Sequence, residues 1–111
     1  MIRQDLDKLE LPQTPGVYFW RDSADKILYI GKATNLRDRT RSYFAPDLIK
    51  TRGAHIVDMV FKSATLTYQE TNSVLEALIL EANLIKKHQP YYNTKEKDDK
   101  SFNCIANFQG T

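Results

Sequence analysis

The sequence predicts an α+β domain, with a small antiparallel β-sheet of about three core strands flanked by helices. One observation behind this prediction is a pair of short apolar runs on either side of a polar turn near residue 23. The other is a long segment rich in Leu, Ala, Glu and Lys, which is typical of a strong helix. The length of 111 residues indicates one domain over residues 1–111. Because the chain stops soon after its last predicted strand, we expect an N-terminal fragment of a longer multidomain protein.

The elements follow in order along the chain. Residues 2–10 predict a short amphipathic helix that is ended by Pro12. Residues 14–20 and 26–31 predict the two strands of an antiparallel hairpin. The next helix has Thr34 or Asn35 as its N-cap. The elements predicted from there on are that helix over 34–44, a short helix over 51–61, a strand over 64–70, a long helix over 72–88 and a late strand over 101–108.

The composition excludes several classes of protein. Hydrophobic residues make up 41% and charged residues 27% of the chain, the ordinary range for a globular domain. No run approaches the roughly 18 apolar residues needed to span a bilayer, and the first ten residues are too charged for a signal peptide. Cys104 is the single cysteine, which excludes a disulfide framework and a thiolate metal cluster. We therefore expect a reducing, cytoplasmic setting.

The hairpin brings two tyrosines together if Trp20 lies opposite Ile27. Tyr18 then lies opposite Tyr29, beside a glycine from each strand that leaves room for another group to approach. Two interpretations remain open: an aromatic pair that only packs, or a pair that faces a site. The other face of the hairpin would be core, and consists of Val17, Phe19, Leu28 and Ile30.

Two charged residues are predicted to point inward. In the helix over 34–44, Arg39 shares a stripe with Leu36 and Tyr43, and an inward arginine usually has a carboxylate or a phosphate as partner. In the long helix, Glu81 lies beside the predicted apolar stripe. A carboxylate there must be protonated, paired or bound to a metal, so an ion pair with Arg39 and a metal site both remain open. The predicted stripe is Val74, Leu78, Ala82 and Ile85.

Positive charge is clustered although the net charge is only +2. Four basic residues against one acid lie between positions 32 and 41, and a second basic step ends the long helix. Such clusters are typical of a phosphate-binding face, but a solvated helix surface explains them equally well. Four of these residues are candidates for contacts to DNA: Arg37, Arg41, Lys86 and Lys87.

"GVY" at 16–18 and "YIG" at 29–31 resemble the paired signature of the GIY-YIG nucleases. The resemblance continues through Lys32, Arg39, Glu81 and then Asn93 after "P-x-Y". Within the family, "YIGKATNLRDRTRSYF", "LILEANLIKKHQPYYN" and "KDDKSF" are most similar to the N-terminal domain of UvrC, a subunit of the UvrABC excinuclease. One departure follows "DDKSF", where Asn103 and Cys104 replace the Pro-aromatic pair usual in UvrC.

The resemblance implies the GIY-YIG endonuclease fold and a phosphodiesterase that uses one divalent metal ion, Mg or Mn. It implies incision on the 3′ side of a lesion in nucleotide excision repair, with damaged double-stranded DNA as substrate and UvrB, docked through regions outside this chain, as partner. Glu81 matches the family's metal ligand, and Tyr18 and Tyr29 match its site tyrosines. The residues that match its supporting polar groups are Lys32, Arg39, Tyr43 and Asn93. The rival interpretations are another GIY-YIG nuclease and a nucleic-acid-binding module that does not cut.

The sequence leaves open whether Tyr18 or Tyr29 is the general base, with a preference for Tyr18. A phenol with a pKa near 10 is a poor base at neutral pH unless a cation lies beside it, and Lys32 or the metal are the candidates. Lys32 is the third residue after Tyr29, so on a flat strand it would point to the opposite face. We therefore expect it beyond the strand end. His55 and His88 are not expected to be ligands.

Overall fold

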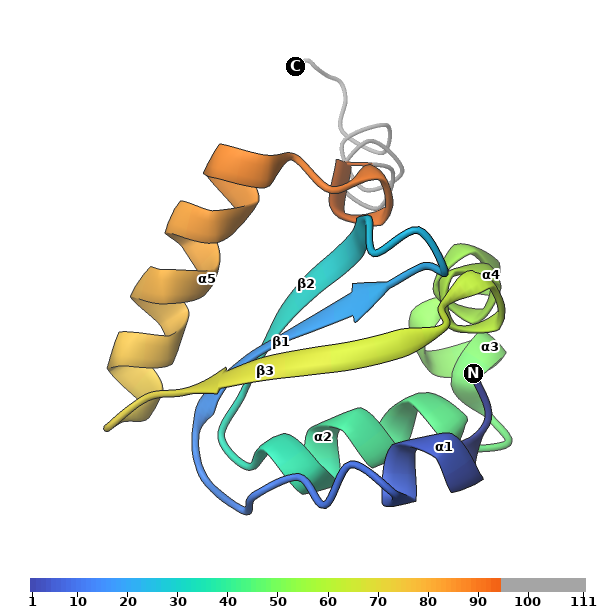
Figure 1. The fold of residues 1–111 in the computed structure, drawn as a ribbon, viewed down its shortest axis with the longest axis horizontal. Helices are drawn as coiled ribbons and strands as arrows, with labels where there is room; N and C mark the ends of the chain where they lie inside the picture. Colours follow the sequence, from blue (N-terminus) through green and yellow to red (C-terminus); the bar gives the residue numbers. More distant parts are fainter. Residues whose placement is uncertain (95–111) are drawn as a thin grey trace.

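Three antiparallel strands form the centre of the computed structural model, which describes residues 1–94 (Figure 1). Strand β1 (Gly16–Arg21) is central, and β2 (Ile27–Ala33) and β3 (Thr65–Glu70) pair with its two sides. This arrangement confirms the predicted α+β class and the hairpin. The late strand predicted over 101–108 lies outside the described residues.

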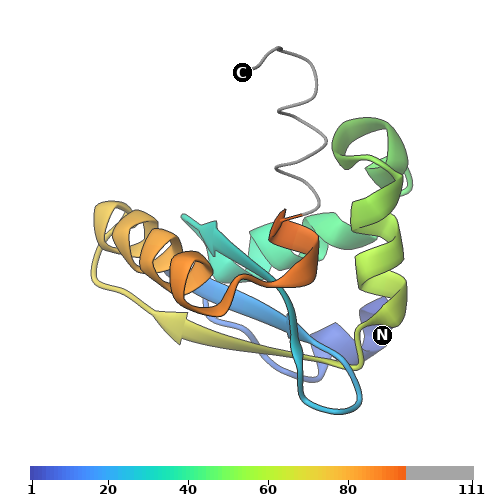
Figure 2. The same cartoon turned by 90° about the horizontal axis from the view of Figure 1, so that it is seen from above.

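Helices cover both faces of the sheet. Helix α5 (Val74–His88) packs on β1 and β2, and the shorter helices lie on the opposite face (Figure 2). These are α1 (Arg3–Asp7), α2 (Leu36–Arg41) with the 3₁₀ turn η1 (Ser42–Phe44), α3 (Leu48–Arg52) and α4 (Ala54–Lys62). None of the described helices has the length and apolar character needed to cross a membrane.

Local signals explain where the helices begin. Asn35 caps α2 by accepting a hydrogen bond from the Asp38 backbone at 3.1 Å, as one of the two predicted caps. Ser73 caps α5 in the same way. The single helix predicted over 51–61 is wrong. The segment is divided at Gly53, whose φ of 95° glycine adopts readily and other residues do not.

The predicted hairpin register is wrong by two residues. Tyr18 pairs with Gly31 and Trp20 with Tyr29, and a bulge follows Trp20. Because side chains alternate between faces with a period of two, this shift keeps both tyrosines on one face. The bulge adds one residue to β2, so Leu28 packs on the tyrosine side instead of the side predicted for it.

The tyrosine face carries the larger core, whereas the prediction placed the core on the other face. Apolar and aromatic residues of α1, α2, η1, α3 and α4 bury that face. The α5 side holds a smaller cluster around Val17, Ile30 and Ala77.

The stripe predicted for α5 is wrong for Val74, Leu78 and Ala82, whereas Ile85 packs against the smaller core cluster. Val74 and Leu78 are 47% and 45% exposed, and the buried face centres on Ala77. This helix is apolar on most sides, so its periodicity does not decide which face packs. Ala77 is fully buried in one cluster with Val17 and Ile30 of the sheet.

Candidate active site

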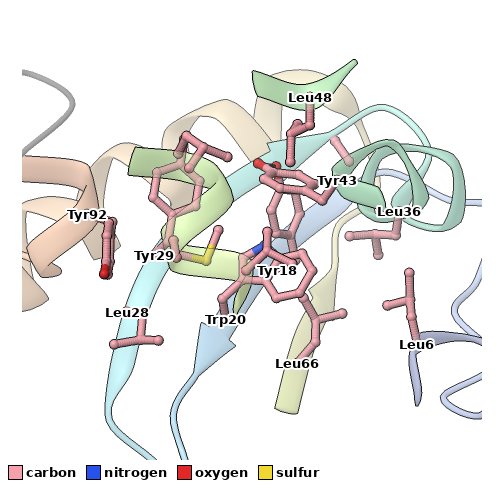
Figure 3. Close-up of a cluster of buried hydrophobic side chains, with 14 of the residues drawn as sticks. Leu6, Tyr18, Trp20, Leu28, Tyr29, Leu36, Tyr43, Leu48, Leu66 and Tyr92 are labelled. Atoms are coloured by element: carbon pink, nitrogen blue, oxygen red, sulfur yellow. Dashed lines mark hydrogen bonds between the residues drawn. The ribbon is translucent and has the colours of Figure 1, made fainter. Parts of the chain in front are cut away.

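Tyr18, Tyr29 and Tyr43 lie close together on the face of the sheet that is opposite α5 (Figure 3). The hydroxyl oxygens of Tyr18 and Tyr43 lie 2.6 Å apart and share a hydrogen bond. The ring centroid of Tyr43 lies 5.7 Å from that of Tyr18 and 6.5 Å from that of Tyr29. All three side chains are buried. The structure therefore brings together the tyrosines that the sequence pointed to.

Gly31 makes room for Tyr18. A Cβ atom at position 31 would overlap the Cζ and Oη atoms of the Tyr18 ring. The group that approaches this glycine is thus Tyr18 of the "GVY" segment. Its ring lies over Gly31, the residue of the "YIG" segment that has no side chain. The two parts of the signature interlock.

Glu81 and Lys32 meet on the α5 side of the sheet. Lys32 lies within β2, opposite Val17, and its Nζ is 3.7 Å from Glu81 Oε1. The expectation that Lys32 lies beyond the strand end is therefore wrong: it points to the opposite face from Tyr29, and that is the face on which Glu81 lies. The side chains of Glu81 and Lys32 are 18% and 46% exposed.

The electrostatics around Glu81 are those of a poorly solvated carboxylate. Burial raises its pKa, and Lys32 and then Arg39 act in the opposite direction without cancelling the effect. The ion pair left open with Arg39 is made instead with Lys32, and Arg39 acts on Glu81 at longer range. A divalent cation at this carboxylate would oppose the effect of burial.

Arg39 lies between the tyrosines and Glu81. It projects from α2 at an exposed position, and its Cζ lies 5.9 Å from the centroid of the Tyr43 ring. Burial lowers the pKa of Arg39, but the hydroxyls of Tyr18 and Tyr43 raise it above its usual value. The stripe prediction is accurate for Leu36 and Tyr43, which are buried, whereas Arg39 remains at the rim.

An open groove of about 520 Å³ runs beside these charges. It is bordered by Lys32 on β2, Arg39 on α2 and Ala77 on α5. The positive side chains at its edge suit a phosphate backbone.

Asn93 binds the backbone of β2 next to Tyr29. Its Oδ1 accepts from the backbone N of Ile30 at 2.8 Å, and its Nδ2 donates to the Ile30 carbonyl at 2.9 Å. Tyr92 donates to Asp58 of α4 at 2.6 Å and holds the same segment in place. The Asn93 amide is therefore engaged with the strand that carries Tyr29.

Arg52 was missed by the sequence analysis. It ends α3, and its Nη2 donates to Tyr29 Oη at 3.1 Å. Its Cζ also lies 5.1 Å from the centroid of the Tyr43 ring. The contact with Tyr29 joins residues 23 positions apart, and no spacing within the chain points to it.

The four candidate DNA contacts divide into two pairs. Arg37 donates to the carbonyl of Leu11 at 3.3 Å, and Arg41 lies 3.5 Å from Asp7. Both are thus engaged with residues 7–11, at the end of α1 and just after it. Lys86 and Lys87 are exposed in the last turn of α5.

The described residues fit one hydrated divalent cation better than a multidentate site. Residues 1–94 hold no group of three His, Cys, Asp or Glu side chains placed to bind a metal. Glu81 offers a poorly solvated carboxylate, and its partner Lys32 lies at the edge of the open groove. Mg²⁺ keeps several water ligands and needs only one or two carboxylates, which suits this arrangement.

The interlocked tyrosines, the groove edged by Lys32 and Arg39 and the half-buried carboxylate of Glu81 define an endonuclease domain of the GIY-YIG class. Residues 14–94 match the family described as the UvrC-like GIY-YIG domain. The chain belongs to this family, and the membership confirms the resemblance found in the sequence.

Similar proteins support the assignment. The chain is 48% identical over 108 residues to UvrABC system protein C of Microcystis aeruginosa, covering 93% of this chain and 17% of that protein. It is 52% identical over 97 residues to the Synechocystis protein of the same name, covering 87% and 15%. The chain thus spans about one sixth of the length of these curated relatives.

A solved structure also matches. It is the N-terminal GIY-YIG endonuclease domain of UvrC from Thermotoga maritima, bound to its catalytic magnesium ion, with a TM-score of 0.69 and 35% identity. The match covers 83% of this chain and 98% of that domain. Point mutants of that domain with Asn→Ala or Tyr→Phe changes are also described as bound to the catalytic divalent cation.

Proposed function

We propose that this domain makes the incision on the 3′ side of lesions in nucleotide excision repair, as the nuclease part of a longer protein. Its substrate is damaged double-stranded DNA in a complex with UvrB. UvrB docks to parts of the protein outside these residues, and the reaction takes place in the cytoplasm. The single observation that carries the proposal is the contact of Glu81 with Lys32, which edges an open groove together with Arg39. The relatives' role as protein C of the UvrABC system supports it.

The charged residues of the groove have separate tasks in this proposal. Glu81 holds the divalent cation, Mg or Mn, which when bound supplies a Lewis acid for a phosphoryl oxygen. Arg39 binds the scissile phosphate and stabilises the charge that develops on its oxygens. Lys32 neutralises Glu81 in the metal-free domain and becomes available to the phosphate when Glu81 turns to the cation.

We assign the activation of the attacking water to Tyr29 and not to Tyr18, which the sequence favoured. Burial raises the pKa of Tyr18 well above its usual value, and its hydrogen bond with Tyr43 adds to this effect. The Tyr29 oxygen, in contrast, accepts a hydrogen bond from the guanidinium group of Arg52. A cationic donor favours the ionised form of a phenol. Tyr18 and Tyr43 then support the position of Arg39.

Lys86 and Lys87 are the more accessible candidates for contacts with the DNA backbone outside the groove. They are exposed, whereas Arg37 contacts Leu11 and Arg41 contacts Asp7. Contacts of this kind position a duplex without reading its sequence.

The test is 3′ nicking of an end-labelled duplex with one lesion, with UvrB loaded, by the full-length protein and its variants. Glu81→Gln should slow nicking by at least about a hundredfold, because the cation loses its carboxylate. Glu76→Gln, on the same helix, is the matched control and should cut normally. Gel shifts should show unchanged binding of DNA and UvrB in both variants. Normal nicking by Glu81→Gln would overturn the assignment, and DNA binding without cutting by the unmutated protein would favour the binding-module alternative.

A further inference from the structure

Arg52 is a charged residue among the tyrosines that lies outside the family signature quoted above. It is half-buried at the end of α3, and its guanidinium contacts both Tyr29 and Tyr43. Its hydrogen bond helps to select Tyr29 in the proposed function, but Arg52 itself has no task there.

The fold holds Arg52 in place from three directions. Leu48, one turn earlier on α3, is buried in the core and anchors the helix. Gly53 follows directly, and its positive φ ends the helix at this point. The Tyr43 ring lies within cation–π distance of the guanidinium, which restricts its position further.

The contact with Tyr29 has a defined direction. Arginine is a donor only, so the 3.1 Å contact between Nη2 and Oη occupies a lone pair of the phenol oxygen. The phenol proton must therefore point away from Arg52. Loss of that proton makes the remaining hydrogen bond charge-assisted and stronger.

We infer that Arg52 is a positioning residue for Tyr29: it orients the phenol proton away from its own guanidinium and stabilises the phenolate that forms when Tyr29 takes a proton from water. This inference rests on the proposed function, because it assigns the general-base role to Tyr29. It extends the site to α3, a helix that carries none of the residues predicted for the site.

Several other titratable groups surround Tyr29. Tyr18 comes from β1, Tyr43 from η1 and Tyr92 from the segment after α5, and all three belong to the same buried cluster as Tyr29. Arg39 of α2 acts on the hydroxyls of Tyr18 and Tyr43. Arg52 is the arginine whose hydrogen bond reaches the Tyr29 oxygen itself.

The experiment measures single-turnover 3′ nicking by the full-length protein with UvrB and Mg²⁺, from about pH 6 to about pH 9.5. Arg52→Gln should cut about ten- to a hundredfold more slowly at neutral pH, since one pKa unit corresponds to a factor of ten. Its deficit should shrink at alkaline pH. Arg52→Lys keeps the charge and should recover most of the rate with the original pH profile. Arg3→Gln, which removes an exposed arginine of α1, should behave as the unmutated protein.

Controls separate this inference from the proposed function. If Tyr29→Phe is inactive and Arg52→Gln cuts normally, Arg52 has no such role, although Tyr29 keeps its own. If Tyr29→Phe and Glu81→Gln both cut normally, the proposed function fails. An equal loss for folded Arg52→Gln at every pH would indicate a purely structural role and overturn the inference.

Thermal unfolding checks that each variant is folded. If Arg52→Gln does not fold, Arg52→Lys carries the test alone. A folded Arg52→Lys that cuts more than about a hundredfold slower at all pH values would overturn the role of the charge. A rate within about tenfold and an unshifted profile would support it.

Discussion

Asn93 holds the backbone of Ile30 through both polar atoms of its side chain, at 2.8 and 2.9 Å. Because β2 is an edge strand, this amide takes the place of a neighbouring strand at that position. The residues on either side are Tyr29 and Gly31, so the clamp acts on the part of the strand on which the tyrosine cluster is built.

Asn93→Ala should therefore destabilise the domain and slow nicking together. Removing the two hydrogen bonds is expected to lower the free energy of unfolding by about 1–3 kcal/mol. Manganese affinity should change little, because Glu81 is unaffected. Urea unfolding and a manganese titration measure these effects, with exposed Asn83→Ala as the control. Unchanged stability of Asn93→Ala would contradict the clamp.

Gly31→Ala should be destabilising because the new methyl group overlaps the Tyr18 ring. Overpacking of this kind costs about 1–3 kcal/mol. The same change in a Tyr18→Ala background should cost clearly less, since the ring is then absent. Urea unfolding of the four proteins in this double-mutant cycle gives the coupling energy, and additive effects would refute the interlock.

Glu81→Gln should stabilise the metal-free domain at neutral pH. Burial raises the pKa of Glu81 in the folded state, so the folded domain is favoured while the carboxyl is protonated. That stabilisation is lost as the pH rises through the folded-state pKa. The advantage of Glu81→Gln should therefore appear at neutral pH and disappear at acidic pH, where both side chains are uncharged.

The same two proteins should respond differently to metal. Manganese should raise the melting temperature of the unmutated domain, because a ligand that binds only the folded state stabilises it. Glu81→Gln should show no such rise. Thermal unfolding with a chelator and then with manganese compares them, and an equal rise in both proteins would place the metal elsewhere.

Tyr18 should make the domain sensitive to alkaline pH. Burial and its bond with Tyr43 raise its folded-state pKa well above 10.0. Above that pH the phenol ionises in the unfolded chain but not in the folded one, so the free energy of unfolding falls as the pH rises. Tyr18→Phe should be less stable at neutral pH by about 1 kcal/mol but lose less on going to alkaline pH. An identical alkaline decline in the two proteins would contradict this assignment.

The α+β class, the hairpin, the family and the site residues other than Arg52 could be predicted from the amino-acid sequence alone. Signature residues such as Tyr18, Tyr29 and Glu81 could be selected because their types and order along the chain match the signature of the GIY-YIG nucleases. The face of the hairpin shared by the two tyrosines was also predictable. It survived a register error because that error was an even number of residues.

The contacts among those residues depend on packing between elements and could not be predicted from the sequence. The partner of Glu81 is Lys32 because β2 keeps its alternation to the end, and the contact crosses from the sheet to α5. Arg52 joins the tyrosines through a contact between separate elements that leaves no periodic trace in the sequence. The packed face of α5 depends on the fit of Ala77 against the sheet. Periodicity specifies which side chains share a face of one element, whereas packing between elements selects the partner of that face.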